Sequence, residues 1–291
     1  MSITKTLIKS VFSDRANLED LPERVIRPAK GWLAIDFSEL WHYRELLYFL
    51  VWRDIKVRYK QTVLGAAWAI IQPVFSMVIF SIIFGKFAGI TFGDVPYPIG
   101  VYAGLLPWMF FSGSVSQSGV SLVNQSYLLT KIYFPRLYVP AASVGTALVD
   151  FAISSGVYVC LMLWYWYVPG PSVLLTPALL ALTILTALGV GNVLAGMTVT
   201  YRDFRYVIPF MLQIWMYASP LVYSATMIPA RYRPLMALNP MYGIIAGFRS
   251  ALLNQPVDWL SLGISAGVAV TIFVFSLYFF RRTERQFADI V

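Results

Sequence analysis

Residues 151–201 read FAISSGVYVC LMLWYWYVPG PSVLLTPALL ALTILTALGV GNVLAGMTVTY, and none of them carries a charged side chain. A helix needs roughly 20 consecutive apolar residues to cross a bilayer, so this stretch holds enough chain for most of two crossings. The sequence Val168-Pro-Gly-Pro171 near its centre is a turn signal. The stretch therefore predicts two membrane helices joined by a short turn.

The remainder of the chain repeats this pattern. A charge placed in hydrocarbon is costly, so gaps between charged residues mark the membrane spans. Together the gaps predict an all-α protein with six transmembrane helices, at residues 63–85, 99–123, 139–167, 174–199, 206–225 and 259–280. The chain is 58% hydrophobic and 12% charged, whereas soluble proteins average about 25% charged residues. A net charge of +8 is also found in nucleic-acid-binding proteins, but the placement of the charges argues against that partner.

Lysine and arginine are distributed unequally between the two sides of this arrangement. With the N-terminus in the cytoplasm, 18 of the 22 Lys and Arg residues lie inside. The positive-inside rule then predicts that both termini are cytoplasmic. Four regions follow, namely a polar N-terminal extension, an interfacial helix, a transmembrane domain and a cytoplasmic tail, at residues 1–35, 36–62, 63–280 and 281–291.

Residues 36–62 are predicted to form an amphipathic helix on the cytoplasmic membrane surface. Leu47, Leu50 and Val51 are interspersed with tyrosine and tryptophan, which favour the headgroup region. The four cations that follow have two interpretations. They anchor the helix on anionic lipid, or they form a cationic lip that receives an anionic lipid-linked substrate. The candidate residues are Arg53, Lys56, Arg58 and Lys60.

Two connections between spans are unusually apolar. Residues 127–136 are on the cytoplasmic side, where exposed apolar groups favour a docking partner; the alternative is a helix lying in the headgroups. Residues 224–257 are on the outer side, and each of their apolar stretches is too short to cross the bilayer. This second connection predicts a re-entrant helical hairpin that narrows the exit of a channel.

Asp150 is the one acidic residue inside a predicted span. An intramembrane carboxylate must face protein or water. It either pairs structurally with hydroxyl groups or a cytoplasmic arginine, or it has a role in a conduit.

Several kinds of chemistry have no motif in this chain. There is no Walker-type phosphate loop, no His-Glu-x-x-His or cysteine pair for zinc, and no Gly-x-Ser-x-Gly elbow. His42 and Cys160 are the sole histidine and cysteine. We therefore expect no catalytic site, metal or cofactor in this chain, and energy for transport from another subunit.

A series of short motifs occurs in order along residues 40–285. They are YFLVWRDIKVRYKQTVLG at 48–65 followed by Trp68 and Gln72-Pro73, YAGLLPW at 102–108, KIYFPR at 131–136, YRDFR at 201–205, Ser219-Pro220, and Leu238-Asn-Pro240 with Gly247-Phe-Arg249. Together they resemble the membrane subunit of bacterial type 2 ABC exporters. Members of that family export lipopolysaccharide O-antigen, capsular polysaccharide or teichoic acid.

The resemblance implies a homodimeric permease in the bacterial inner membrane, with two copies of a separate ATPase that binds ATP and Mg. It would move a lipid-linked polysaccharide from cytoplasm to periplasm. Three groups of residues acquire implied roles: ATPase coupling at Lys131, Ile132, Tyr133, Phe134 and Arg136; the exit hairpin at Asn239 and Arg249; and the conduit lining at Trp68, Phe75, Asp150, Trp215 and Tyr217.

Three alternatives remain open at this stage. The first is a permease of the same type that exports a small drug, lipid or peptide. The others are a membrane-embedded transferase and a passive channel or scaffold without an ATPase.

Overall fold

A computed structural model of the chain describes residues 41–60, 67–93, 95–131 and 133–284. The predicted N-terminal extension 1–35 lies outside the described residues, as do residues 36–40 and 61–62 of the predicted interfacial helix and residues 285–291 of the tail. The described helices all belong to a single unit, residues 36–291. Their regular structure is helical apart from one isolated bridge between Phe92 and Val95, which confirms the all-α prediction.

Among the described residues, five helical segments are long and apolar enough to cross a membrane. Each matches a predicted span to within a few residues at the ends that the structure describes. They are α4 with the π-helical η2 (Ala67–Phe80 and Ser81–Phe87), α5 (Tyr97–Asn124), α7 (Tyr138–Trp164), η3 with α8 (Pro171–Leu175 and Thr176–Thr200), and α12 (Trp259–Glu284). The turn predicted at Val168-Pro-Gly-Pro171 separates α7 from η3.

The span predicted at residues 206–225 corresponds to a shorter helix. This helix, α9 (Phe204–Tyr217), has 14 residues and is roughly 21 Å long at 1.5 Å per residue, less than the ~30 Å hydrocarbon core. The helix ends before Ser219-Pro220, since a proline disfavours helical geometry in the residue that precedes it.

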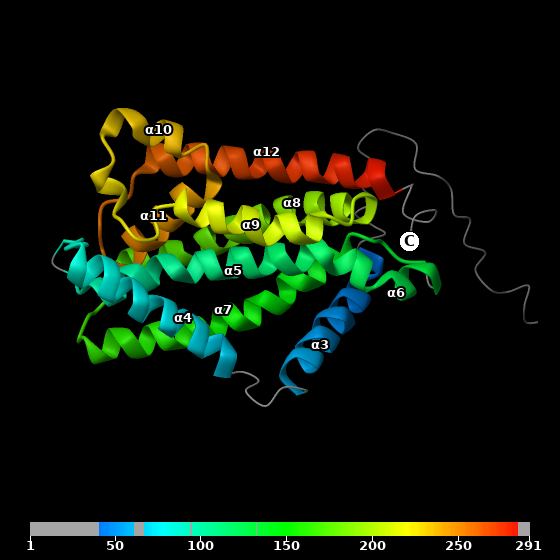
Figure 1. Cartoon of the computed structure of the whole chain (residues 1–291), viewed down its shortest axis with the longest axis horizontal. Helices are drawn as coiled ribbons and strands as arrows, with labels where there is room; N and C mark the ends of the chain where they lie inside the picture. Colours follow the sequence, from blue (N-terminus) through cyan, green and yellow to red (C-terminus); the bar gives the residue numbers. More distant parts are fainter. Residues whose placement is uncertain (1–40, 61–66, 94, 132, 285–291) are drawn as a thin grey trace, which may run out of the picture. The chain divides into compact units, whose positions relative to one another are not determined.

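Helix α5 forms the centre of the packing. Of its most apolar stretch 78% is buried inside the protein, against 11% for α4 with η2. Figure 1 shows α5 between α7 on one side and α8, α9 and α12 on the other, and the helix contacts α7, α8, α9 and α11. The outer surface of α4 is therefore left free for lipid or another protein chain.

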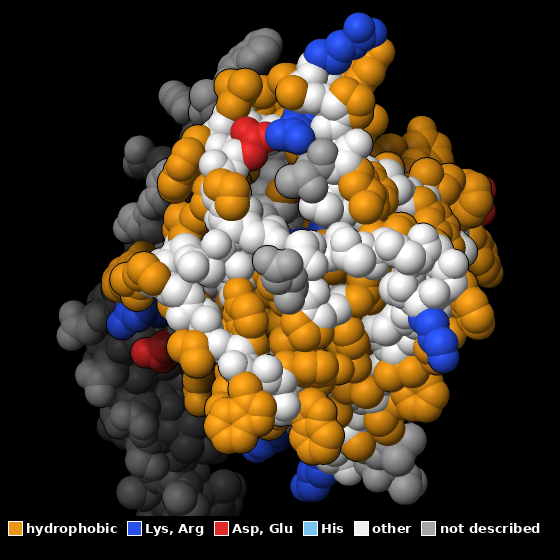
Figure 2. All heavy atoms as spheres, turned by 90° about the vertical axis from the view of Figure 1, so that its left-hand side faces the viewer, with side chains coloured by type: hydrophobic (Ala, Val, Ile, Leu, Met, Phe, Trp, Pro, Cys, Tyr) orange, Lys and Arg blue, Asp and Glu red, His pale blue; other side chains and the backbone are white. Residues whose placement is uncertain are grey.

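Two groups of short helices lie at opposite ends of the long ones (Figure 1). Helix α3 (Arg44–Lys60) packs on α7, and α6 (Ser126–Lys131) lies at the same end as the C-terminus of α12. The other end holds α10 (Arg233–Met236) and α11 (Pro240–Leu252). Figure 2 views this second end, where hydrophobic side chains alternate with backbone and uncharged polar groups and charged side chains are few and scattered.

The outer connection folds as a series of short helical pieces. Two 3-10 turns, η4 (Ala225–Met227) and η5 (Ala230–Tyr232), lead into α10, which packs on α12. Helix α11 then enters the protein, where nearly all its residues are buried against α5, α8 and α12. Asn239 caps its start by accepting a hydrogen bond from the Met241 amide at 3.0 Å.

Candidate functional site

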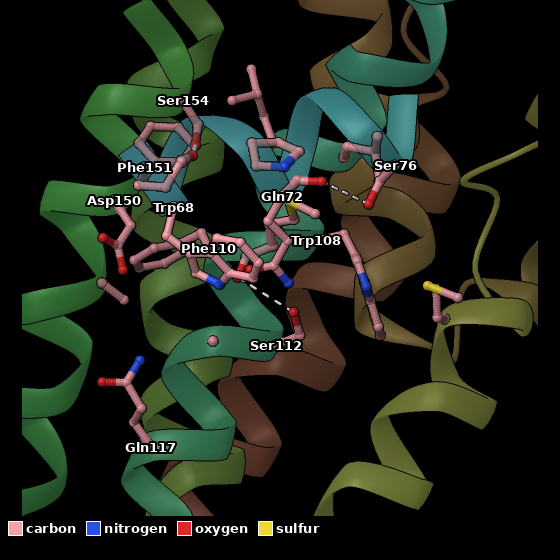
Figure 3. Close-up of a pocket in the computed structure, with 18 of the residues that line it drawn as sticks. Trp68, Gln72, Ser76, Trp108, Phe110, Ser112, Gln117, Asp150, Phe151 and Ser154 are labelled. Atoms are coloured by element: carbon pink, nitrogen blue, oxygen red, sulfur yellow. Dashed lines mark hydrogen bonds between the residues drawn. The ribbon is translucent and has the colours of Figure 1, made fainter. Parts of the chain in front are cut away.

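A cavity of about 830 Å³ opens between α3, α4, α5 and α7, with Met216 of α9 at its edge. This volume is within the range of about 300–1,000 Å³ that is typical of small-molecule sites. Figure 3 shows Trp68, Gln72 and Ser76 of α4 on one side, facing side chains of α5 and α7. The four helices bring together residues that lie far apart in the sequence.

The lining combines aromatic rings with uncharged polar groups. Six aromatic side chains contribute: Tyr59, Trp68, Phe80, Trp108, Phe110 and Phe151. The polar groups are amides and hydroxyls, from Gln72, Gln117, Ser76, Ser112 and Ser154. Aromatic faces offer large apolar contact areas, while amides both donate and accept hydrogen bonds. This combination suits a ligand with apolar C–H faces and many hydroxyl groups.

One polar network lies at the α3 side of the cavity. The Arg58 guanidinium of α3 pairs with the Asp150 carboxylate of α7 and donates to the Gln117 side-chain oxygen of α5. The Tyr59 hydroxyl donates to the other Asp150 oxygen. Burial, and next the hydrogen bond to Asp150, raises the pKa of Tyr59 above its ordinary value, so this hydroxyl stays protonated. Three helices are therefore joined around one carboxylate.

A second polar contact lies one turn further along α7. Pro73 has no backbone N–H, so the Ala69 carbonyl four residues earlier lacks its usual helical partner. The Ser154 hydroxyl of α7 donates to this carbonyl at 3.3 Å. Backbone groups in a membrane must be satisfied within the protein, so Ser154 holds α4 where Pro73 interrupts its hydrogen bonding.

The predicted lining residues fall into three sets. Trp68 and Asp150 line this cavity. Phe75 and Tyr217 lie outside it with exposed side chains. Trp215 turns into the protein instead, where its indole N–H donates to the Asn239 side-chain oxygen at 2.7 Å and its ring packs edge-on against Phe111.

Trp68 and Phe75 are seven residues apart and therefore lie on nearly the same side of α4. Along α4 the cavity is lined by a row of residues four apart, Trp68, Gln72, Ser76 and Phe80, and beside it by Ala69 and Pro73. Such a row drifts around the helix because a turn has 3.6 residues. At the height of Phe75 the row has reached Ser76, which points about 100° away from Phe75 around the helix, so Phe75 does not line the cavity.

The predicted cationic lip is also divided. Arg53 pairs with Asp54 on the exposed side of α3, and the Lys56 ammonium lies 5.1 Å from the centre of the Trp52 ring. Lys60 is exposed at the end of the helix. Arg58 instead faces α7, which places it in the cavity network and away from the other three.

The predicted coupling residues differ in exposure. Tyr133 is 59% exposed, whereas Phe134 is 4% exposed and packs in a cluster with Leu122, Val139 and Phe280. Tyr133 and Phe134 therefore do not form one exposed surface for a partner. Lys131 is exposed with its ammonium 5.7 Å from the centre of the Tyr127 ring. Arg136 donates to the Glu284 carbonyl at 2.7 Å, and Ile132 lies outside the described residues.

Both residues assigned to the exit hairpin bind backbone inside the protein. The Arg249 guanidinium is buried and donates to the carbonyls of Gly100, Pro220, Leu221 and Tyr223. It also lies 4.3 Å from the centre of the Phe92 ring. The Asn239 amide donates to the Ser219 hydroxyl at 3.0 Å. Both residues hold the turn that ends α9.

Sequence reasoning missed Gln117, Ser154 and the inward direction of Arg58. A detectable signal existed for each of the first two. Gln117 is an amide within an apolar span, and such groups seek polar partners. The presence of Pro73 in a span implies a freed carbonyl that some nearby donor must bind.

The chain is similar to known proteins over most of its length. The sequence model of the ABC-2 type transporter family matches residues 45–253. An O-antigen export system permease protein of Myxococcus xanthus is 30% identical over 255 residues, which cover 86% of this chain and 97% of that protein. One from Klebsiella pneumoniae is 24% identical over 248 residues, covering 85% and 95%. A polysialic acid transport protein of Escherichia coli is 26% identical over 235 residues, covering 76% and 87%.

Proposed function

Because the chain belongs to the ABC-2 type transporter family, we propose that it is the membrane permease of an ATP-driven exporter that moves a lipid-linked polysaccharide across the bacterial inner membrane. The observation that carries the proposal is the cavity lined by six aromatic side chains, amides and hydroxyls. A sugar ring has C–H faces that pack on aromatic rings and hydroxyls that bind amides. The names of the relatives, which refer to O-antigen export and polysialic acid transport, support the same substrate class.

The exposed side of α3 is the proposed entry for the lipid headgroup. It presents Tyr48 and Trp52, which favour the membrane interface, beside Arg53, Lys56 and Lys60. An anionic headgroup and anionic membrane lipids are both attracted to such a basic surface. The sugar chain would then reach the cavity on the other side of the helix.

The segment from α6 to Arg136 is the proposed site of ATPase docking. Tyr127 and Tyr133 are exposed there, next to Lys131. The bond from Arg136 to the Glu284 carbonyl links this segment to the end of α12. The partner would bind ATP and Mg and supply the energy, since this chain has no phosphate-binding loop of its own.

The proposed assembly contains two copies of this permease and two copies of the ATPase. In support, α4 with η2 leaves a broad apolar surface uncovered in one protomer. A conduit between two copies would be lined by exposed aromatic side chains such as Phe75 and Tyr217. These two residues keep their predicted role only in such a conduit.

We propose six crossings with both termini in the cytoplasm. Helix α9 would form the fifth, with the α10–α11 segment as a re-entrant hairpin that covers its shorter outer end. The hydrogen bonds of Asn239 and Arg249 to residues 218–223 support this pairing. Helix α3 would be the interfacial helix that precedes the first crossing.

Deletion of the coding sequence tests the function. We expect polysaccharide to accumulate inside the cell and to disappear from its surface, and the permease supplied on a plasmid should restore export. Purification of the tagged permease should recover an ATPase subunit. Unchanged surface polysaccharide in the deletion strain would contradict the proposal. Loss of resistance to a drug, with normal polysaccharide, would instead favour a permease for small drugs, lipids or peptides.

A further inference from the structure

The cavity has no net charge along its described lining. Arg58 and Asp150 are the two charged residues among those that line it, and they pair with each other. Both members of the pair also make a hydrogen bond to another side chain, because the Gln117 oxygen accepts from Arg58 and the Tyr59 hydroxyl donates to Asp150. A ligand in the cavity therefore meets aromatic, amide and hydroxyl groups.

The helices beside the cavity extend this neutral surface. Residues 61–85, which include α4, carry no charged side chain, and neither do residues 206–230, which include most of α9. Lys86 lies in the last turn of η2, and Arg205 lies in the first turn of α9. The cations thus stand at the ends of the crossing helices.

A group of accessible cations lies near the cavity but outside it, on the outer side of α3. Arg53, Lys56 and Lys60 are exposed there, while Arg58 faces the cavity and is neutralised. One helix consequently separates a basic surface, suited to an anionic headgroup, from a neutral cavity suited to sugar rings.

From this separation we infer that the transported glycan is uncharged and that the cavity discriminates against repeats bearing a carboxylate. The inference rests on the function proposed above and specifies its substrate. A carboxylate entering the cavity would lose water without meeting an unpaired cation. It would also approach the Asp150 carboxylate, and like charges across an interface oppose binding.

Three synthetic glycans with the same polyprenyl diphosphate anchor and the same length provide the test. Their repeats are glucose, glucuronic acid, and the methyl ester of glucuronic acid, which removes the charge and keeps most of the shape. Each is added to the permease–ATPase complex in lipid nanodiscs, and ATP hydrolysis is measured against glycan concentration. The concentration that gives half-maximal stimulation should be about tenfold higher for the acidic glycan than for either neutral one.

Two variants assign the effect to the cavity. Asp150→Asn leaves Arg58 without its counter-charge. The half-maximal concentration of the acidic glycan should therefore fall relative to those of the neutral glycans. Asp54→Asn removes the same charge from α3 outside the cavity, where Asp54 pairs with Arg53. Its ratio of acidic to neutral half-maximal concentrations should equal that of the unaltered protein.

The possible results separate this inference from the proposed function. Equal or better stimulation by the acidic glycan in the unaltered complex would overturn the inference and leave polysaccharide export intact. A ratio unchanged in Asp150→Asn would overturn the assignment of discrimination to this cavity. If none of the three glycans stimulates ATP hydrolysis and the deletion strain displays normal polysaccharide, the export function itself fails.

Discussion

Two polar residues on α7 connect the cavity walls at the scale of single side chains. Asp150 binds Arg58 and Tyr59 of α3, and Ser154 binds the Ala69 carbonyl of α4. The two residues are four apart and so lie on one side of α7. One side of α7 therefore binds both α3 and α4, the two helices on the opposite side of the cavity.

The Arg58–Asp150 pair should contribute measurably to stability. Their side chains are 30% and 31% exposed, so the pair is only partly screened by solvent. We expect a coupling free energy of about 1–2 kcal/mol from the double-mutant cycle of Arg58→Ala and Asp150→Ala. The measurement is equilibrium unfolding in mixed micelles.

The matched control for that cycle is the Arg53–Asp54 pair on the same helix. Arg53 is 43% exposed, and pairs at the surface typically couple by about 0–1 kcal/mol. Equal coupling in the two pairs would show that the Arg58 network adds nothing beyond a surface contact.

Ser154 should matter because of Pro73. Ser154→Ala leaves the Ala69 carbonyl without a donor and should lower the free energy of unfolding by about 0.5–1.5 kcal/mol. Pro73→Ala returns a backbone N–H to α4, which can bind the same carbonyl. In that background Ser154→Ala should therefore be nearly neutral. An equal loss in both backgrounds would refute the link between the two residues.

At the scale of elements, α3 depends on close contact with α7. A methyl group added at Gly145 would lie 2.7 Å from a Val51 methyl carbon, closer than real carbon contacts allow. Val51 has few alternative rotamers because it is β-branched. The absence of a side chain at Gly145 thus allows α3 to seat on the transmembrane helices.

Gly145→Ala should displace α3 and reduce export, because the headgroup entry and the cavity both use this helix. Gly156→Ala is the control, because Gly156 is on α7 like Gly145 and a methyl group added there meets no atom within 4 Å. Surface polysaccharide should fall in the first variant and remain normal in the second. Limited proteolysis within α3 should increase in Gly145→Ala alone, and equal behaviour of the two variants would contradict the seating argument.

Two neighbouring residues after α6 allow ATPase docking and folding to be tested separately, because Tyr133 is exposed and Phe134 is buried. Tyr133→Ala should reduce glycan-stimulated ATP hydrolysis by the complex without lowering the melting temperature, since Tyr133 is exposed. Phe134→Ala should destabilise the permease by about 3–5 kcal/mol, because it empties a packed cluster. Full stimulation in a stable Tyr133→Ala complex would exclude this segment as the coupling site.

At the scale of the whole molecule, the uneven burial of the spans points to assembly. Helix α5 is enclosed, while α4 and η2 are covered on one side only. Lipid can cover an apolar helix as well as protein can, so exposure alone does not identify the occupant. The proposed dimer requires that α4 of one copy lie near α4 of the other.

Cross-linking in native membranes tests this arrangement. Cys160 is first changed to Ser, because it is exposed. Phe75→Cys should then give a covalent dimer with a short bismaleimide. The control is Val270→Cys. Val270 is exposed on α12, which lies on the other side of α5 in Figure 1, so this variant should give no cross-linked dimer. Dimer from Val270→Cys but not from Phe75→Cys would place the interface elsewhere.

The amino-acid sequence alone was enough to predict the helical class, the positions of five helices that are long and apolar enough to cross a membrane, and the need of Asp150 for a polar partner. Charge placement was sufficient, because the penalty for a charge in hydrocarbon is large and acts wherever the residue lies along a span. The short motifs likewise sufficed for the family. None of these conclusions required knowing which helix lies beside which.

The direction in which each side chain points, by contrast, depends on how the helices pack against one another. Arg58 faces Asp150, Phe134 faces the cluster with Leu122 and Phe280, and Phe75 is exposed outside the cavity. In a membrane protein, lipid and the protein interior are both apolar, so hydrophobic periodicity does not reveal which side of a helix is covered. That choice depends on contacts between distant segments, such as Ser154 with the carbonyl that Pro73 leaves free.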